Sequence, residues 1–381
     1  MRFTRLKLEN WRNFRRVDVP LSPGVVIVGP TASGKTNLLD GLLFLRDVAD
    51  PACGFQRAVL SNRGGMAQLR HFGAQKKAPV AIEVEMIEEE IDEEDRPTIT
   101  YRLEFAADDV GRPVVRREVV KVGDLALMAR PDEADRGDAV RLRQPHLQQE
   151  SANRVCRGIR DFLASIRVHD TRGGMALGAL PRRQCAAELA ERIASTEPRT
   201  RAARLRDLHD ALRAVISGFE RLDFRFDDRG VPRLGIKFSS WRSGADTQDQ
   251  SAFSEGTLAL LGRLWTLLEP GGPLVLDGPD LPLDQVVGLR LARWIPEVAR
   301  SAQVLMVAEA SFLAAAPDSS PADVLMLIPE LSETRAVRPV DDEESKALLA
   351  SGTSLAQAVL TRIIRRPDPG GPRKKGPARK L

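Results

Sequence analysis

Residues 29–36 read G-P-T-A-S-G-K-T and fit the spacing G-x-x-x-x-G-K-T. The apolar run 25–28 precedes this segment, and a helical pattern follows over 37–45. The order strand, glycine loop and helix collects backbone N–H groups and a helix N-terminus around one point, which suits phosphate oxygens. We expect Lys35 to reach the β- and γ-phosphates of a nucleotide and the Thr36 hydroxyl to bind Mg²⁺. The sequence therefore predicts an α/β fold built around a phosphate-binding loop.

Charge is distributed unevenly along the 381 residues, a length that suits one large domain or two ordinary ones. Residues 361–381 hold eight of the 57 Lys and Arg residues and one of the 53 Asp and Glu residues. The rest of the chain therefore has 49 basic and 52 acidic residues and is slightly acidic. A Pro/Gly-rich basic tail is expected to be disordered. Contact with nucleic acid and a purely solvated tail remain open for it.

Cysteine usage and hydropathy predict the compartment. Cys53, Cys156 and Cys185 are far apart and form no C-x-x-C pair, so neither a zinc site nor a disulfide frame is expected. The chain has no run of 18 apolar residues, and residues 1–8 lack the core of a signal peptide. We expect a cytoplasmic protein without a membrane span.

Periodicity divides the chain into four parts. We expect an N-terminal part of an ATPase head over 1–143, a helical insertion over 144–219, a C-terminal part of the head over 220–360, and the tail over 361–381. Apolar and polar residues alternate as in strands, with an antiparallel β meander among them, over 2–8, 15–21, 80–87, 98–105 and 114–120.

Segments in the second half of the chain complete a nucleotide site. Residues 253–257 read F-S-E-G-T before a helical pattern and resemble the signature motif of ABC-type ATPases. Residues 273–277 are an apolar strand ending in Asp277, the Walker B pattern, which places a carboxylate for Mg²⁺. Residues 277–284 match the segment from Walker B to the D-loop, and 303–308 read as the next strand.

The resemblance narrows to the RecF/SMC/OLD group of ABC ATPases. Residues 10–14, N-W-R-N-F, look like the entry of that group, as does the signature form S-E-G-T-L at 254–258. Residues 324–328 and 354–358 look like the end of compact bacterial AAA-type ATP-binding proteins of the group. The likeness covers roughly residues 1 to 140 and 220 to 360, and matches the helical insertion only loosely.

This resemblance implies a two-lobed head that forms a head-to-tail homodimer or a higher oligomer, with ATP and Mg²⁺ between the phosphate loop of one subunit and the signature of the other. It assigns Mg²⁺ to Thr36 and Asp277. It assigns nucleotide binding to a larger set: Arg12, Asn13, Gly29, Pro30, Thr31, Ala32, Ser33, Gly34, Lys35, Thr36, Asn37, Ser254, Glu255, Gly256 and Asp284.

Two catalytic side chains of the group are absent from their usual places. Gly278 stands where the catalytic glutamate follows the Walker B aspartate, and Ala308-Glu309-Ala310 replaces the Thr-His-Ser switch. Glycine can neither orient nor deprotonate water, so we expect binding to dominate over hydrolysis. A relocated base stays open, with Glu309 as first candidate and Asp280 as second. No glutamine-loop residue is identified; Gln68 and Gln75 lie in the region but neither fits well.

Two functions remain open. The first is an ATP-dependent dimerising switch that acts through a separate effector protein, a nuclease or toxin in antiphage defence by family analogy. The second is a DNA-binding ATPase of DNA repair or recombination. The slightly acidic body opposes it, whereas the tail and the arginines of the insertion favour it: Arg182, Arg183, Arg199, Arg201 and Arg204.

Overall fold

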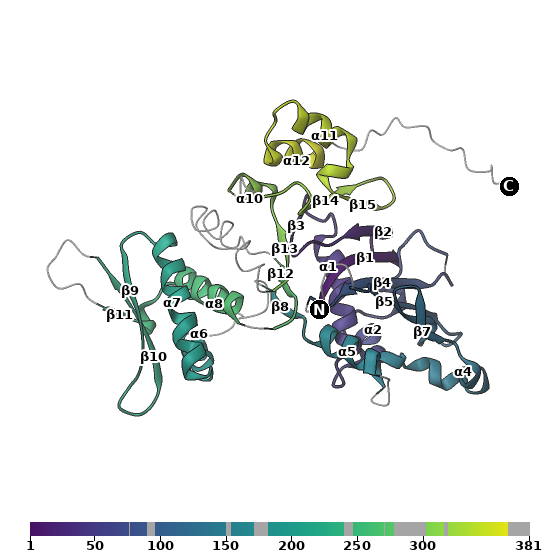
Figure 1. Cartoon of the computed structure of the whole chain (residues 1–381), viewed down its shortest axis with the longest axis horizontal. Coiled ribbons are helices and arrows are strands. Elements are labelled where there is room, and N and C mark those ends of the chain that lie inside the picture. Colours follow the sequence, from purple (N-terminus) through teal and green to yellow (C-terminus); the bar gives the residue numbers. More distant parts are fainter. Residues whose placement is uncertain are drawn as a thin grey trace.

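The computed structural model describes residues 1–75, 77–89, 96–149, 154–170, 182–239, 247–269, 271–277, 302–315 and 319–364. These residues form two lobes (Figure 1). We call the described residues of 1–170, 271–277 and 302–364 the body, and those of 182–269 the second lobe. Within these described ranges, no helix is both long and apolar enough to cross a membrane.

An antiparallel sheet of six strands forms one side of the body. Its strands lie in the order β2 (Phe14–Pro20), β1 (Arg2–Trp11), β4 (Val80–Ile87), β5 (Ile99–Ala107), β6 (Pro113–Val122) and β7 (Leu125–Arg130). Residues alternate between a buried face and a charged face, on which Arg102 pairs with Glu9, Glu83 and Glu104. Alternation of this kind is typical of a sheet with one solvated face. The expected antiparallel meander is confirmed.

A second six-stranded sheet is parallel except at one edge. The order is β15 (Thr334–Val337), β14 (Val324–Pro329), β3 (Gly24–Val28), β13 (Val304–Ala308), β12 (Leu274–Asp277) and β8 (Arg167–Asp170), with only β15 antiparallel. Its central strands are continuous apolar runs because both faces are buried. The carboxyl ends of five strands meet at one edge, from which the phosphate loop leaves β3.

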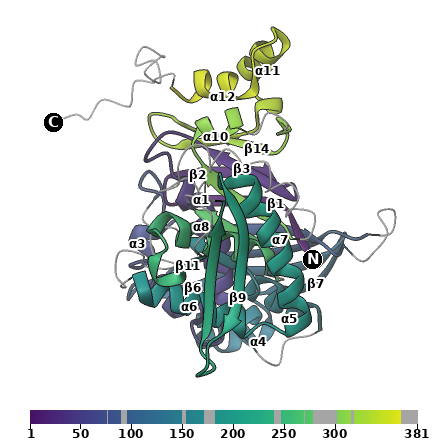
Figure 2. The ribbon, with the colours of Figure 1, turned by 90° about the vertical axis from the view of Figure 1, so that its left-hand side faces the viewer.

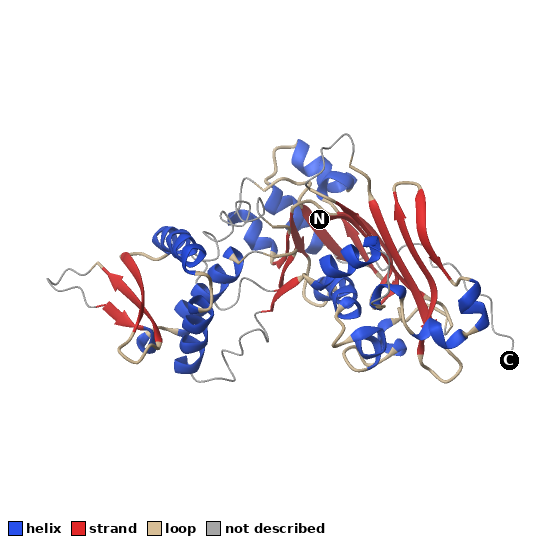
Figure 3. Cartoon of the chain, turned by 60° about the horizontal axis from the view of Figure 1, so that its bottom comes forward, coloured by secondary structure: helices blue, strands red, loops and turns tan. Residues whose placement is uncertain are grey.

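Helix α1 (Lys35–Ala49) packs between the two sheets, and its buried residues share one core with strands of both. Figure 3 shows helices lying beside the strands of the body. Its Phe44 ring packs against Trp11, Phe55 and Phe105, with centroid separations of 5.5, 6.4 and 5.2 Å. Helix α5 (Arg154–Ala164) packs on α1 from the outside, while α2 (Gly54–Leu60) and α3 (Met66–Leu69) follow α1 along the chain. The phosphate-loop helix is therefore anchored by aromatic packing at Phe44.

The second lobe combines helices with a small sheet. It contains α6 (Arg182–Ala194), α7 (Pro198–Val215), α8 (Glu255–Leu268) and a sheet in the order β11 (Thr247–Asp249), β10 (Pro232–Phe238) and β9 (Phe219–Phe226). Seen from that side, the β9–β10 hairpin lies in front of the helices (Figure 2). The hydrophobic core of this lobe continues into the face of the parallel sheet turned away from α1.

The C-terminal helices close the top of the body (Figure 1). They are α10 (Ala310–Ala315), α11 (Glu343–Ala350) and α12 (Leu355–Ile364). Buried Asp342 caps α11 and accepts hydrogen bonds from Arg335 and Arg362, which joins α12 to the end of β15. Short segments complete the described elements: α4 (Glu133–Gly137), η1 (Ala139–Arg143), η2 (His146–Gln148), η3 (Gln250–Ala252) and η4 (Pro339–Asp341).

The expected part boundaries differ from this arrangement in three places. Residues 154–170, expected in the insertion, belong to the body, because α5 packs on α1 and β8 pairs with β12. Residues 220–269, expected in the head, belong to the second lobe and share its core. Residues 361–364, expected in the tail, belong to α12, where Arg362 is held by Asp342. Residues 365–381 lie outside the described part.

Candidate nucleotide site

The phosphate loop runs from Gly29 to Gly34 between β3 and α1, as expected from its spacing. Gly34 caps α1 with a φ of 94°, a left-handed conformation that favours glycine. A Cβ atom at Gly34 would also lie 2.2 Å from Nδ2 of Asn13, so a side chain there would force Asn13 to move. The backbone conformation and the approach of Asn13 both favour glycine at this position.

Three side chains with phosphate and metal chemistry converge at the start of α1. The Lys35 ammonium donates hydrogen bonds to the carbonyls of Gly29 and Pro30 at 2.7 and 3.1 Å, so it lies over the loop. The Thr36 hydroxyl donates to Oδ2 of Asp277 at 3.0 Å, and Asp277 is 8% exposed at the end of β12. A hydroxyl and a carboxylate oxygen this close are ligands that Mg²⁺ prefers. These residues therefore fit an Mg²⁺–nucleotide.

Asn13 links the phosphate loop to neighbouring segments by hydrogen bonds of its side-chain amide. Its Nδ2 donates to the carbonyl of Ser33 at 3.0 Å and to the Thr334 hydroxyl at 2.9 Å. Its Oδ1 accepts from Nδ2 of Asn37 at 2.8 Å, within the first turn of α1. Asn13 therefore contacts the backbone of the phosphate loop and, through Asn37, the first turn of α1. Both residues were expected to touch the nucleotide, and that contact stays a prediction.

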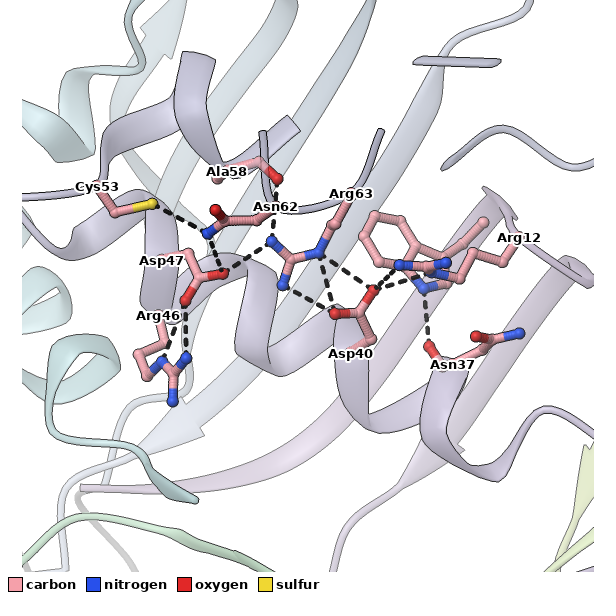
Figure 4. Close-up of polar contacts among 10 residues, drawn as sticks. Arg12, Asn37, Asp40, Arg46, Asp47, Cys53, Ala58, Asn62 and Arg63 are labelled. Carbon is pink, nitrogen blue, oxygen red and sulfur yellow. Dashed lines mark hydrogen bonds and ion pairs between the residues drawn. The ribbon is translucent and has the colours of Figure 1, made fainter. Parts of the chain in front are cut away.

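Arg12 lies beside α1 in a row of alternating charges (Figure 4). Its guanidinium donates twice to Oδ2 of Asp40, at 2.9 and 2.7 Å. Buried Arg63 bridges Asp40 and Asp47. Burial raises the pKa of Asp47, but hydrogen bonds from Arg46 and Arg63 outweigh burial and leave the pKa lowered. Arg12 is therefore held by Asp40, and its expected contact with nucleotide stays a prediction.

The signature segment opens α8 on the second lobe. Ser254 caps the helix by accepting a hydrogen bond from the Thr257 backbone N–H at 3.1 Å. Gly256 is uncrowded, since a Cβ there would have only the Ser254 hydroxyl, at 3.9 Å, within 4 Å. The side chain of Glu255 lies outside what is described. Thus α8 presents its N-terminus from a different lobe than the one that carries the phosphate loop (Figure 1).

Of the two candidate bases, the described residues include only Glu309. Glu309 follows directly after β13 and is exposed at the carboxyl edge of the parallel sheet. Asp277 on the neighbouring strand is in register with Val307, two residues before Glu309. Gly278, Asp280 and Asp284 lie outside the described residues. Glu309 therefore shares an edge with the phosphate loop and Asp277, and no role as base follows from that alone.

Strand β8 lies next to β12 at the edge of the parallel sheet. It reads R-V-H-D, too short and too polar for periodicity to identify a strand, and it pairs in parallel with β12. The glutamines considered from the sequence lie elsewhere: Gln68 in α3 and Gln75 in the loop before β4. The sequence shows that β8 ends in polar residues, but only the strand pairing shows that Asp170 is the register partner of Asp277.

The phosphate loop, the Walker B aspartate and the serine-capped helix on a second lobe together fit the nucleotide-binding head of an ABC-type ATPase. The model of the family "AAA domain, putative AbiEii toxin, Type IV TA system" matches residues 25–307, most of the chain. The chain belongs to this family.

Solved structures agree on the fold. The SmcHead bound to the C-winged helix domain of ScpA has a TM-score of 0.56 at 16% identity and covers 88% of this chain and 98% of its own. The Smc head with an extended coiled coil, bound to the C-terminal domain of ScpA and derived from Pyrococcus furiosus, has a TM-score of 0.54 at 14% identity. It covers 92% of this chain and 99% of its own.

Curated relatives match over a short stretch. The DNA replication and repair protein RecF of Roseiflexus castenholzii is 39% identical over 61 residues, and that of Brucella abortus (strain 2308) is 47% identical over 56 residues. The first match covers 16% of this chain and 16% of that relative, and the second covers 14% of each. The chain therefore matches only a small part of these relatives' length. What RecF does as a whole protein is therefore a proposal for this chain.

Proposed function

We propose that this chain binds ATP with Mg²⁺ and that ATP joins two copies head to tail. The observation that carries the proposal is the division of the site between lobes. The body holds Lys35, Thr36 and Asp277, whereas the second lobe holds the helix capped by Ser254. A nucleotide clamped between two copies has donors from both at its γ-phosphate, Lys35 from one copy and the N-terminus of α8 from the other.

Each residue then has a defined role. Lys35 binds the β- and γ-phosphates, and Thr36 and Asp277 hold Mg²⁺, which neutralises phosphate charge when bound. The N-terminus of α8 in the second copy, with Ser254 and uncrowded Gly256, meets the γ-phosphate. Asn13 keeps the loop in shape through the Ser33 carbonyl.

We further propose that hydrolysis is weak or absent. Gly278 provides no carboxylate where the catalytic glutamate normally stands. A long-lived closed dimer then acts as a switch, because closed and open forms present different surfaces. The output comes from a partner protein, and the toxin system in the family description supports an antiphage setting by analogy. Binding of a ScpA domain to an Smc head supports a partner protein in the same way.

Light scattering tests the dimer. The wild type is expected to dimerise with ATP and Mg²⁺ but not with ADP. Lys35→Ala should weaken ATP binding more than about tenfold, because it removes a charged phosphate contact of roughly 2 kcal/mol. Ser254→Arg should leave ATP binding by the monomer intact and abolish dimerisation, because the arginine obstructs the N-terminus of α8.

A matched control uses Ser195→Arg. Ser195 follows α6 and is exposed; it lies near the other end of α8, because Arg192 contacts Glu269. A helix of 14 residues separates the two ends by about 20 Å. This variant should dimerise like the wild type. Unimpaired dimerisation of Ser254→Arg would refute the head-to-tail arrangement.

DNA binding is the second candidate. Helix α7 supports it, since Arg199, Arg206 and Arg213 are exposed at seven-residue spacing and so follow one stripe. Binding to duplex DNA that falls steeply with salt, and that weakens when these three become glutamine, would favour this function. ATP-dependent capture of a protein without DNA would favour the switch.

A further inference from the structure

The first residue of β15 contacts the turn between β1 and β2 that also holds the phosphate loop. The Thr334 backbone N–H donates to the carbonyl of Asn13 at 3.1 Å, and the Thr334 hydroxyl accepts from Nδ2 of Asn13 at 2.9 Å. Thr334 is buried and stands 321 positions from Asn13 in the chain. It lies in none of the sequence motifs that predicted the site, so its place beside the phosphate loop comes from the fold.

The side-chain amide of Asn13 is held by three partners. An amide nitrogen carries two donor hydrogens, and those of Asn13 go to the Ser33 carbonyl and to the Thr334 hydroxyl. The amide oxygen accepts from Nδ2 of Asn37 at 2.8 Å. Ser33 and Asn37 belong to the phosphate loop and the first turn of α1, whereas Thr334 belongs to a strand. Of these three partners, Thr334 therefore connects the amide to the parallel sheet.

The contact with Ser33 determines how one peptide of the phosphate loop is oriented. In a trans peptide, the carbonyl and the following N–H point in opposite directions. A Ser33 carbonyl directed at Asn13 therefore directs the Gly34 N–H away from Asn13. Backbone N–H groups of a glycine loop before a helix are donors suited to phosphate oxygens. The orientation of the Asn13 amide thus bears on the direction of a phosphate donor.

We propose that Thr334 is a positioning residue for nucleotide binding, which acts through Asn13 on the Ser33–Gly34 peptide and does not itself contact the nucleotide. This inference rests on the proposed binding of Mg²⁺–ATP. Asn13 packs closely against Gly34, since a Cβ atom there would lie 2.2 Å from its Nδ2, so a turn of the Asn13 amide displaces the loop. The hydrogen bond to the Thr334 hydroxyl opposes that turn.

The position of Thr334 is itself fixed by its neighbours. Strand β15 pairs with β14, and β14 pairs with β3, the strand from which the phosphate loop leaves. The turn between β14 and β15 is also held, because the Ser332 carbonyl lies 3.1 Å from Nε2 of buried His71. Arg335, the next residue, forms an ion pair with Asp342. Thr334 therefore stands on a support that belongs to the same sheet as the start of the loop.

Nucleotide affinity tests this proposal without relying on hydrolysis. The measurement is binding of a fluorescent, slowly hydrolysed ATP analogue to the full chain. Thr334→Val keeps the shape of the side chain and removes the hydroxyl, so it should weaken binding about fivefold, the effect of one lost hydrogen bond. Thr334→Ser keeps the hydroxyl and should stay within about twofold of the wild type.

Two further variants define where the effect arises. The loss in Thr334→Val should be the same in EDTA and with Mg²⁺, because the loop binds phosphate and not the metal. Asp277→Asn should instead reduce the gain in affinity that Mg²⁺ gives, since it removes the carboxylate proposed to hold the metal. Thr361→Val is the matched control, because it also removes a hydroxyl with one hydrogen bond, to the Gln357 carbonyl on α12. It should bind nucleotide like the wild type.

A double-mutant cycle separates positioning from packing. Asn13→Ala should weaken binding by itself, and adding Thr334→Val should then change affinity little, because the route from Thr334 to the loop is gone. Urea unfolding of each variant measures stability alongside. A Thr334 that only supports the fold would lower stability in both backgrounds without changing affinity.

The possible outcomes separate the two proposals. Affinity of Thr334→Val within about twofold of the wild type overturns the role of Thr334 and leaves the proposed function standing. Equal losses in Thr334→Val and Thr334→Ser overturn it as well, as do independent effects of Asn13→Ala and Thr334→Val that multiply in the double variant. Absence of nucleotide binding by the wild type overturns the proposed function itself.

Discussion

Three buried charged residues, Glu118, Arg130 and Asp135, form a hydrogen-bonded cluster at the end of the antiparallel sheet. Glu118 is fully buried and accepts hydrogen bonds from the Tyr101 hydroxyl and from the backbone N–H groups of His146 and Leu147. Burial raises the pKa of Glu118. Arg130 contacts Glu118 and also binds both oxygens of Asp135. Removing one member of such a cluster leaves a buried partner uncompensated.

A pH dependence of stability follows at this scale. The hydrogen bond from Arg130 lowers the pKa of Asp135 from 3.8 to about 2. The carboxylate therefore contributes stability above about pH 4, and that contribution is lost as the pH falls toward 2. Asp135→Asn should lower the free energy of unfolding by roughly 3 kcal/mol at neutral pH. Urea unfolding of both proteins should show this difference shrinking near pH 2. A difference independent of pH would contradict the assignment.

At the scale of elements, Arg167 joins the end of α8 to strand β8. The last carbonyls of a helix lack partners within it, and a basic side chain satisfies them. Arg167 reaches the Thr266 and Glu269 carbonyls, while Arg192 forms an ion pair with Glu269. Burial lowers the pKa of Arg167, and Arg192 and Arg204 lower it further, against the opposing effect of Glu269. The helix that carries Ser254 is thus connected to the strand next to Walker B.

Replacing this connection should be costly. Arg167→Ala leaves carbonyls at the end of α8 without their charged donor, so the free energy of unfolding should fall by at least about 2 kcal/mol. Arg199→Ala, on the exposed side of α7, should change it by less than about 0.5 kcal/mol. Urea denaturation measures both. Equal stability of the two variants would show that the connection is dispensable.

At the scale of the whole molecule, the parallel sheet separates two hydrophobic cores, because alternate residues of its strands point to opposite faces. Val25 and Ile27 face the core around α1, whereas Val26 and Val28 face the core that continues into the second lobe. Because β3, β12, β13 and β14 each contribute to both cores, the two lobes share one sheet as their support. The nucleotide site lies at its carboxyl edge, as in open α/β sheets generally. A complete site, in the proposed arrangement, needs a second copy.

A prediction about ATP hydrolysis follows from the proposed site between two copies. Steady-state turnover of ATP by the wild type is expected to be near background, because position 278 is glycine. Gly278→Glu should then raise turnover, since it restores a carboxylate able to orient water. Glu309→Gln should have no effect. Turnover by the wild type that disappears in Glu309→Gln would instead identify Glu309 as a relocated base.

The sequence alone determined those features that depend on neighbours in the chain. The phosphate loop needs glycine at fixed offsets and a following helix, so residues 29–36 predicted its structure directly. The Walker B strand and the serine cap of α8 are local in the same way. The strands of the meander were predictable because one face is solvated and alternation is visible.

Tertiary structure decided what depends on pairing between distant segments. A four-residue strand such as β8 is too short to have a recognisable period and is stabilised by β12, so Asp170 became a neighbour of Asp277 only in the sheet. The division into lobes also depended on packing, because α5 has the same helical pattern as α6 but packs against α1. Amphipathic periodicity shows that a helix has a buried face, and only the folded chain determines which surface covers it.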